Sequence, residues 1–111
     1  MEKGETISSS KLSKPADFMT LQKAIDLGEY DPGYLSTFPE WQMLSPHVQL
    51  QHIKQGLDNR ERQLITQWAE VVNVIDFSKK PQLQVALRNI EKQLKKVHSD
   101  RERYYLEYSS K

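Results

Sequence analysis

The strongest constraint on the fold is the spacing of apolar residues toward the C-terminus. They recur in alternating steps of four and three residues, the repeat that keeps side chains on one face of an α-helix. The series consists of Leu83, Leu87, Ile90, Leu94, Val97, Arg101, Tyr104 and Tyr108. A long helix is therefore predicted over residues 81–108, with Arg101 as the one polar side chain on its apolar face.

A second long helix is predicted over residues 46–75. Ser45 is a favourable N-cap, Pro46 suits the first helical position, and the next proline is Pro81. Heptad spacing gives this segment an apolar face as well. That face consists of Leu50, Ile53, Leu57, Leu64, Val71 and Val74. Gly56 and the polar run after it mark a point where the helix could kink, although one glycine costs a helix only about 1 kcal/mol.

Only a short connection separates these two segments, so they are expected to pack as antiparallel neighbours. The predicted fold class is all-α: a long antiparallel helical hairpin, coiled-coil-like, without strands. Aligning the two apolar faces places Arg101 near Leu57. Because an unpaired arginine is costly there, a carboxylate partner is predicted, either Glu61 or Asp58.

A short helix over about residues 16–27 and an aromatic-rich connector over residues 28–44 precede the hairpin. Pro15 or Asp17 is expected to start this helix, and Gly28 supplies a left-handed stop. Both segments are too apolar to remain free of the hairpin, so they are predicted to pack on it.

The connector is expected to form short helical turns, one of them opening at Asp31-Pro32. Its aromatic side chains and those at the end of the last helix meet at the open end of the hairpin. The set consists of Phe38, Trp41, Tyr104, Tyr105 and Tyr108. Core packing is favoured over a ligand-stacking platform, because the connector needs an apolar surface to cover.

The chain has 111 residues, which suits one domain with a modest core. We assign that domain to residues 15–111 and a disordered polar tail to residues 1–14. The absence of cysteine excludes disulfides, thiolate nucleophiles and cysteine-ligated metals. No stretch is apolar enough for a membrane span or a secretory leader, so a cytoplasmic protein is expected.

No pattern typical of catalysis or cofactor binding occurs in the chain. It has neither a glycine-rich phosphate loop nor a Gly-x-Ser-x-Gly elbow. His47 and His52 are five residues apart, which separates them by about 140° on a helix and prevents a shared metal ion. His98 is expected to form a hydrogen bond with residues 58–62. We therefore predict no catalytic residue, no cofactor, no metal and no small-molecule substrate.

Basic side chains form a stripe on the outer face of the last helix. The stripe consists of Arg88, Lys92, Lys95, Lys96 and Arg103. One interpretation is contact with nucleic-acid phosphates. The other is a solvated face balanced by pairs within the helix, namely Glu91–Lys95, Lys96–Asp100 and Arg103–Glu107. The net charge of +1 favours the second interpretation.

Near the predicted turn, the second long helix carries apolar residues at more positions than one partner helix can cover. Ile65, Trp68 and Val72 are predicted to border a patch used in self-association or in docking another protein. The favoured function is a non-enzymatic protein-interaction module, such as an assembly factor, an adaptor or a small subunit of a larger complex. The alternative is a nucleic-acid-associated protein that uses the basic stripe.

Overall fold

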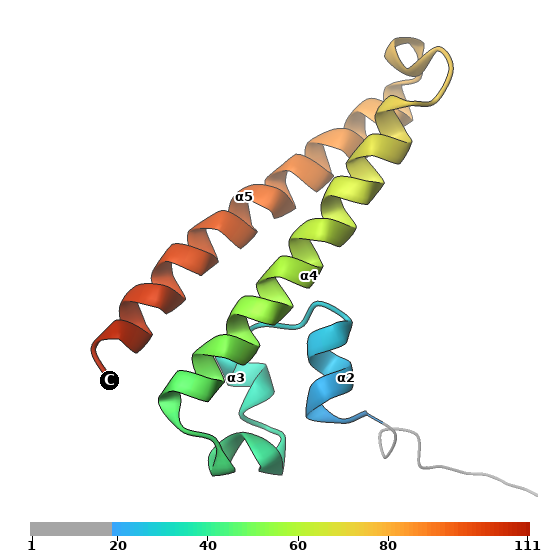
Figure 1. The fold of residues 1–111 in the computed structure, drawn as a ribbon. Coiled ribbons are helices and arrows are strands. Elements are labelled where there is room, and N and C mark those ends of the chain that lie inside the picture. The colour runs from blue at the N-terminus through green and yellow to red at the C-terminus, as the bar shows by residue number, and fades with distance from the viewer. Residues whose placement is uncertain (1–18) are drawn as a thin grey trace, which may run out of the picture.

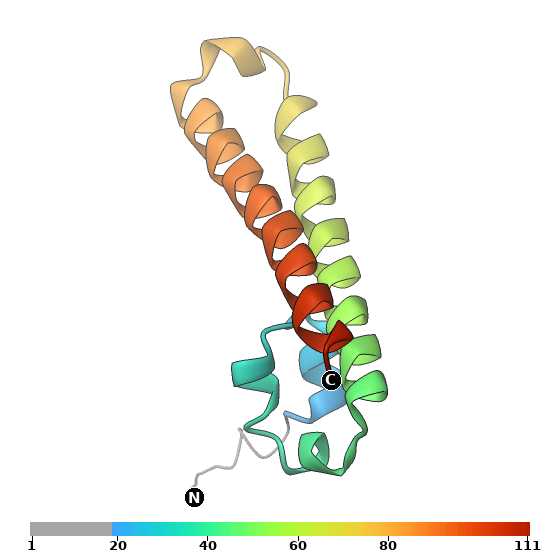
Figure 2. The same cartoon turned by 90° about the vertical axis from the view of Figure 1, so that its left-hand side faces the viewer.

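The computed structural model describes residues 19–111, and every regular element among them is helical (Figure 1). The predicted all-α class is confirmed. Two long helices, α4 (Pro46–Val72) and α5 (Pro81–Ser109), lie side by side and run in opposite directions. Residues 73–80 connect them at one end (Figure 2). At the other end, the open end, the Tyr108 hydroxyl donates a hydrogen bond to Gln49 (3.3 Å).

Three short elements occupy the segment before α4. They are α2 (Leu21–Asp26), α3 (Pro32–Leu35) and the 3₁₀ helix η2 (Pro39–Met43). All three gather toward the open end (Figures 1 and 2). The helix α3 begins at Asp31-Pro32 as predicted, because the Asp31 carboxylate accepts a hydrogen bond from the backbone N–H of Tyr34 (3.1 Å).

The helix α2 is shorter than the helix predicted over residues 16–27. Thr20 has an extended backbone, and its hydroxyl accepts a hydrogen bond from the backbone N–H of Lys23, so α2 begins after it. Gly28 follows the end of α2 with a left-handed φ of 92°, the stop that was expected. The predicted tail over residues 1–14 and the predicted helix start lie outside the described residues.

Side chains of α4 satisfy the carbonyl groups at the end of α2. Asn59 donates a hydrogen bond to the Ile25 carbonyl (2.9 Å), and Gln63 donates one to the Leu27 carbonyl (2.9 Å). A helix end leaves such carbonyls without partners in its own backbone. The polar run after Gly56, where a kink was considered, is thus a docking surface for α2, and α4 continues through it without interruption.

The long helices differ slightly from their predicted bounds. The helix α4 ends at Val72 instead of residue 75, because the chain turns through Asp76, which has a left-handed φ of 60°. A single 3₁₀ turn, η3 (Phe77–Lys79), then leads into α5. Pro81 starts α5 as predicted, and the helix extends one residue beyond the expected end.

Burial is uneven along the two long helices. We call residues 65–95 the turn half and residues 19–64 with 96–111 the open half. In the turn half Ile90 is the one buried residue, whereas the open half holds the rest of the core. That core consists of Leu21, Ala24, Ile25, Leu35, Trp41, Ile53, Leu57, Leu64, Val97 and Tyr104. The difference arises because α2 and the connector add a third layer in the open half alone.

Candidate functional site

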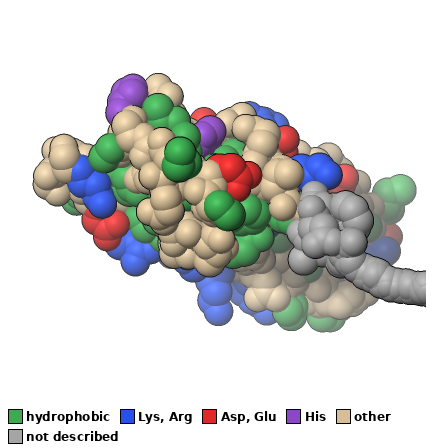
Figure 3. Space-filling model, turned by 90° about the horizontal axis from the view of Figure 1, so that it is seen from below, with side chains coloured by type: hydrophobic (Ala, Val, Ile, Leu, Met, Phe, Trp, Pro, Cys, Tyr) green, Lys and Arg blue, Asp and Glu red, His purple; other side chains and the backbone are tan. Residues whose placement is uncertain are grey.

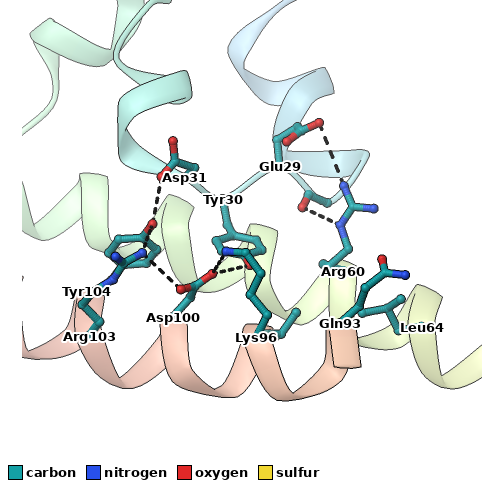
Figure 4. Close-up of a pocket in the computed structure, with 12 residues that line it drawn as sticks. Glu29, Tyr30, Asp31, Arg60, Leu64, Gln93, Lys96, Asp100, Arg103 and Tyr104 are labelled. Carbon is teal, nitrogen blue, oxygen red and sulfur yellow. Dashed lines mark hydrogen bonds and ion pairs between the residues drawn. The ribbon is translucent and has the colours of Figure 1, made fainter. Parts of the chain in front are cut away.

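A polar network joins the connector to α5 in the open half (Figure 4). The Tyr30 hydroxyl and the Lys96 ammonium each donate a hydrogen bond of 2.7 Å to Oδ2 of Asp100. Arg103 donates to the other carboxylate oxygen of Asp100 (3.1 Å). The Asp100 side chain is 9% exposed, so three donors surround a carboxylate that has little contact with water.

The surroundings of Asp100 favour its charged form. Burial alone would raise the pKa of Asp100, but hydrogen bonds from Lys96 and Tyr30, with the positive charges of Lys96 and Arg103, outweigh it. The net result is a pKa below the usual value. Burial and the same carboxylate raise the pKa of Tyr30, which keeps its hydroxyl a donor.

A second link in the network runs through Tyr104. Its hydroxyl donates a hydrogen bond to Asp31 (2.8 Å) and accepts one from Arg103 (2.7 Å). Burial and the nearby Asp31 carboxylate raise the pKa of Tyr104 to about 12. Because Asp31 also caps α3, this bond fixes the start of that helix against α5.

The network lines a hollow of about 290 Å³ between the connector and α5. Its central polar side chains bind one another through these hydrogen bonds. Chemically the arrangement is an anchor that holds the connector on the long helices. Sequence reasoning missed it, since Asp31 was read as a helix cap and Asp100 as a partner of Lys96 alone.

The side of α4 that faces away from α2 carries a ladder of contacts to α5. It consists of Lys54–Tyr105, Asp58–Arg101, Glu61–His98 and Trp68–Glu91. Each step along α4 is matched by an equal step back along α5. Lys54, Glu61 and Trp68 are spaced by seven residues, as are their partners, so the two helices keep one register over this length.

Two predicted partners are confirmed in this ladder. The Arg101 guanidinium bridges both of the carboxylates considered, Asp58 (3.0 Å) and Glu61 (2.9 Å). His98 Nε2 lies 3.0 Å from the Glu61 carboxylate, within the region expected for its hydrogen bond. The Arg101 side chain is 24% exposed, so the bridge is only partly withdrawn from water.

The predicted interface residues lie beyond the ladder, in the turn half. Ile65 is 51% exposed and Trp68 is 38% exposed, while Val72 is partly buried. The indole N–H of Trp68 donates a hydrogen bond to Glu91 (3.3 Å). Much of the indole ring remains in contact with water. By helical geometry these positions lie about 150° around α4 from the residues that contact α2. The N-terminal helix therefore does not cover them.

Exposed apolar residues also occur in the open half, among them Leu27, Met43 and Leu106. Figure 3 views the molecule from that end and shows apolar side chains interspersed with charged ones of both signs and with histidines. Of the aromatic set expected there, Trp41 and Tyr104 are buried. Phe38, Tyr105 and Tyr108 pack against the same core, so the core-packing interpretation is confirmed.

The structure divides the basic stripe into two groups. Lys96 and Arg103 bind Asp100, so the predicted Lys96–Asp100 pair is confirmed. Arg103 bonds to Asp100, three residues before it on the same helix, instead of Glu107. Glu91 bonds to Trp68 on α4 instead of Lys95 on its own helix. The second group, Arg88, Lys92 and Lys95, is exposed and has no ion pair among the described residues.

Within residues 19–111, no helix has the length and apolar character needed to cross a membrane. The same part of the chain holds no group of three or more side chains suited to binding a metal ion. The chain matches no family model, no curated protein and no solved structure.

Proposed function

We propose that this chain is a non-enzymatic protein-interaction module: an assembly factor, an adaptor or a small subunit of a larger complex. It acts as a coiled-coil-like antiparallel hairpin whose turn half binds another protein. The observation that carries the proposal is the burial pattern, since residues 65–95 include many apolar side chains but bury only Ile90. Contiguous exposed apolar surface usually marks an interface.

The open half supports this interpretation by contrast. There, α2 and the connector cover α4 and α5, and the apolar side chains that face them become buried. Two helices by themselves bury only the sides that face each other. The turn half lacks a third layer from the described residues, so a partner that supplies one would bury Ile65, Trp68 and Val72.

Affinity capture with matched variants tests the proposal. The purified chain is compared with a double variant, Ile65→Glu with Val72→Glu, and with Leu106→Glu as a control. Leu106 is 72% exposed on α5 but lies in the open half. Proteins captured by the wild type and by the control should be lost from the double variant. Capture of the same proteins by all three would contradict the proposal, provided that circular dichroism shows equal helix content.

A second candidate function is supported by Arg88, Lys92 and Lys95, which are exposed and form no ion pair within residues 19–111. These three cations could contact nucleic-acid phosphates. A salt titration against generic RNA and DNA separates the two functions, because phosphate contacts weaken steeply as salt rises while an apolar interface does not. Absence of binding at low salt would remove this alternative.

A further inference from the structure

We infer that the turn half binds an amphipathic helix with acidic flanks, supplied by a partner protein. The inference rests on the proposed function and adds the chemistry of the partner. Two features coincide in residues 65–95: apolar side chains that are not buried, and basic side chains that form no ion pair with any residue that the structure describes.

The positions of the exposed apolar side chains indicate which side of the α4–α5 pair binds the partner. Ile65, Trp68 and Val72 lie on the side of α4 that faces away from α2. On the other side of the turn half, exposed positions are polar, among them Gln67, Glu70, Asn89 and Gln93. An added helix along the apolar side would lie against both long helices, as a third helix does in a bundle. The partner element that fits is therefore a helix with one apolar face.

The basic side chains of the turn half favour a partner helix with acidic residues beside its apolar face. Residues 65–95 contain five basic and three acidic side chains, a net charge of +2. The ion pairs of the described residues all lie in the open half, and none involves a residue of the turn half. Arg88 and Lys95 stand on either side of Glu91, whose carboxylate is already bonded to Trp68. Carboxylates on a docked helix would pair with these cations.

A second copy of the chain fits this surface less well. Two turn halves facing each other would each bring a net charge of +2, and like charges across an interface oppose binding. At the inner end of the surface, Asp58 and Glu61 are already paired with Arg101 and His98. A nucleic acid would satisfy the cations but leave the apolar side chains without a complementary surface.

A displayed peptide library tests the inference directly. Each member is an 18-residue helix with Leu, Ile, Val or Ala on one face and flanking positions randomised among Glu, Gln, Ser and Lys. Selection on the full chain should enrich Glu over Lys at the flanks. A labelled peptide from the selected pool should bind at least about tenfold more weakly to the Ile65→Glu, Val72→Glu variant, because a charge replaces apolar contact. Leu106→Glu should bind it unchanged.

A second variant, Arg88→Glu with Lys95→Glu, tests whether these two cations pair with the acidic flanks of the partner helix. It should weaken binding of the selected peptide and strengthen binding of the same peptide with Lys at its flanks. Selected peptides could show no preference for Glu at their flanks and still bind the Ile65→Glu, Val72→Glu variant more weakly. That result would overturn the acidic flanks of the partner and leave the proposed function standing. Failure to enrich any helix would overturn the inference. A dimer of the chain that buries Trp68 would also overturn the inference. Binding of the full chain to phosphatidylserine vesicles through the turn half would overturn it as well.

Discussion

The backbone of Glu29 lies directly against Gly56 of α4. A Cβ atom at position 56 would collide with the Glu29 carbonyl oxygen and lie 2.9 Å from its carbonyl carbon. The same added Cβ atom would lie 3.0 Å from the Cβ of Tyr30. Gly56 is buried in the middle of α4, because the connector crosses the helix at this point. Glycine normally weakens a helix at such a position.

Replacing Gly56 with alanine is therefore expected to destabilise the fold. Alanine favours a helix by about 1 kcal/mol over glycine, but a Cβ forced against backbone typically costs about 1–3 kcal/mol or more. We expect a net loss of about 1–2 kcal/mol in the free energy of unfolding, measured by urea denaturation. Gln55→Ala, at the exposed neighbouring position, is the control and should change little. Equal or greater stability of the Gly56 variant would contradict the close approach.

The Asp100 network predicts loss of stability in acid. Because the pKa of Asp100 is lowered in the folded state, its contribution is complete above the unfolded pKa of about 4 and is lost as pH falls further. Asp100→Asn should cost about 1–3 kcal/mol at pH 7, with the difference from wild type shrinking between about pH 4 and pH 2. Urea unfolding at a series of pH values measures this. A difference independent of pH would show that Asp100 is not charged in the network.

The tyrosines of the network predict the opposite sign in alkali. The pKa values of Tyr30 and Tyr104 are raised, that of Tyr104 to about 12, so their contribution is complete below about pH 10 and is lost above it. Burial and the charge of Glu107 raise the pKa of Tyr108 as well, so absorbance at alkaline pH should show the hydroxyls of Tyr30, Tyr104 and Tyr108 ionising late. Tyr30→Phe and Tyr104→Phe should each remove one of them. Ionisation of all tyrosines together near pH 10, in protein that is still folded, would argue against the two hydrogen bonds.

Periodicity predicted those parts of the fold that repeat along the helices. The extent of α5 and the two carboxylates bound by Arg101 follow from which residues share a helical face. The start of α4 follows from a local signal, the cap at Ser45 and the proline after it. The same reasoning predicted an exposed surface at Ile65, because it counted more apolar positions than one partner helix can cover. These features depend on spacing within a segment, which the sequence displays directly.

The contacts of the connector could not be predicted in the same way. Tyr30 and Asp100 are 70 residues apart, and their bond depends on the path of a segment without a repeat. Gly56 looked like a weak point of α4, yet it is the position where that segment crosses. Likewise Asn59 and Gln63 bind the carbonyls of α2, and nothing in the spacing of α4 marks them as contacts. Each case requires the position of a second segment, and spacing within one helix carries no information about it.

Arg101 provides a test of the register between the long helices. Arg101→Leu should change the free energy of unfolding by less than about 1 kcal/mol, because a partly exposed ion pair contributes little and leucine suits the apolar face. The double variant Asp58→Asn with Glu61→Gln should cost more, about 1–2 kcal/mol, since it leaves the guanidinium without a carboxylate. Thermal unfolding measures both. A larger loss in Arg101→Leu than in the double variant would argue against this reasoning.

The basic stripe should respond to charge reversal in two different ways. By helical position alone, Lys96 belongs with Lys92 and Lys95, and reversing these three would be expected to leave folding intact. The structure separates them, because Lys96 lies 2.7 Å from the Asp100 carboxylate, whereas Lys92 and Lys95 have no ion pair in the described part of the chain.

Lys96→Glu should therefore destabilise the chain, by about 1–3 kcal/mol, because it removes a donor from a nearly buried carboxylate and adds a like charge beside it. The triple variant Arg88→Glu, Lys92→Glu, Lys95→Glu should change stability by no more than about 0.5–1 kcal/mol, as exposed substitutions usually do. Urea denaturation at pH 7 and again below pH 3 distinguishes the causes. Protonation of Asp100 and of the introduced carboxyl at the lower pH should narrow the gap between Lys96→Glu and wild type. A gap that persists in acid would assign the loss to packing and not to the Asp100 charge.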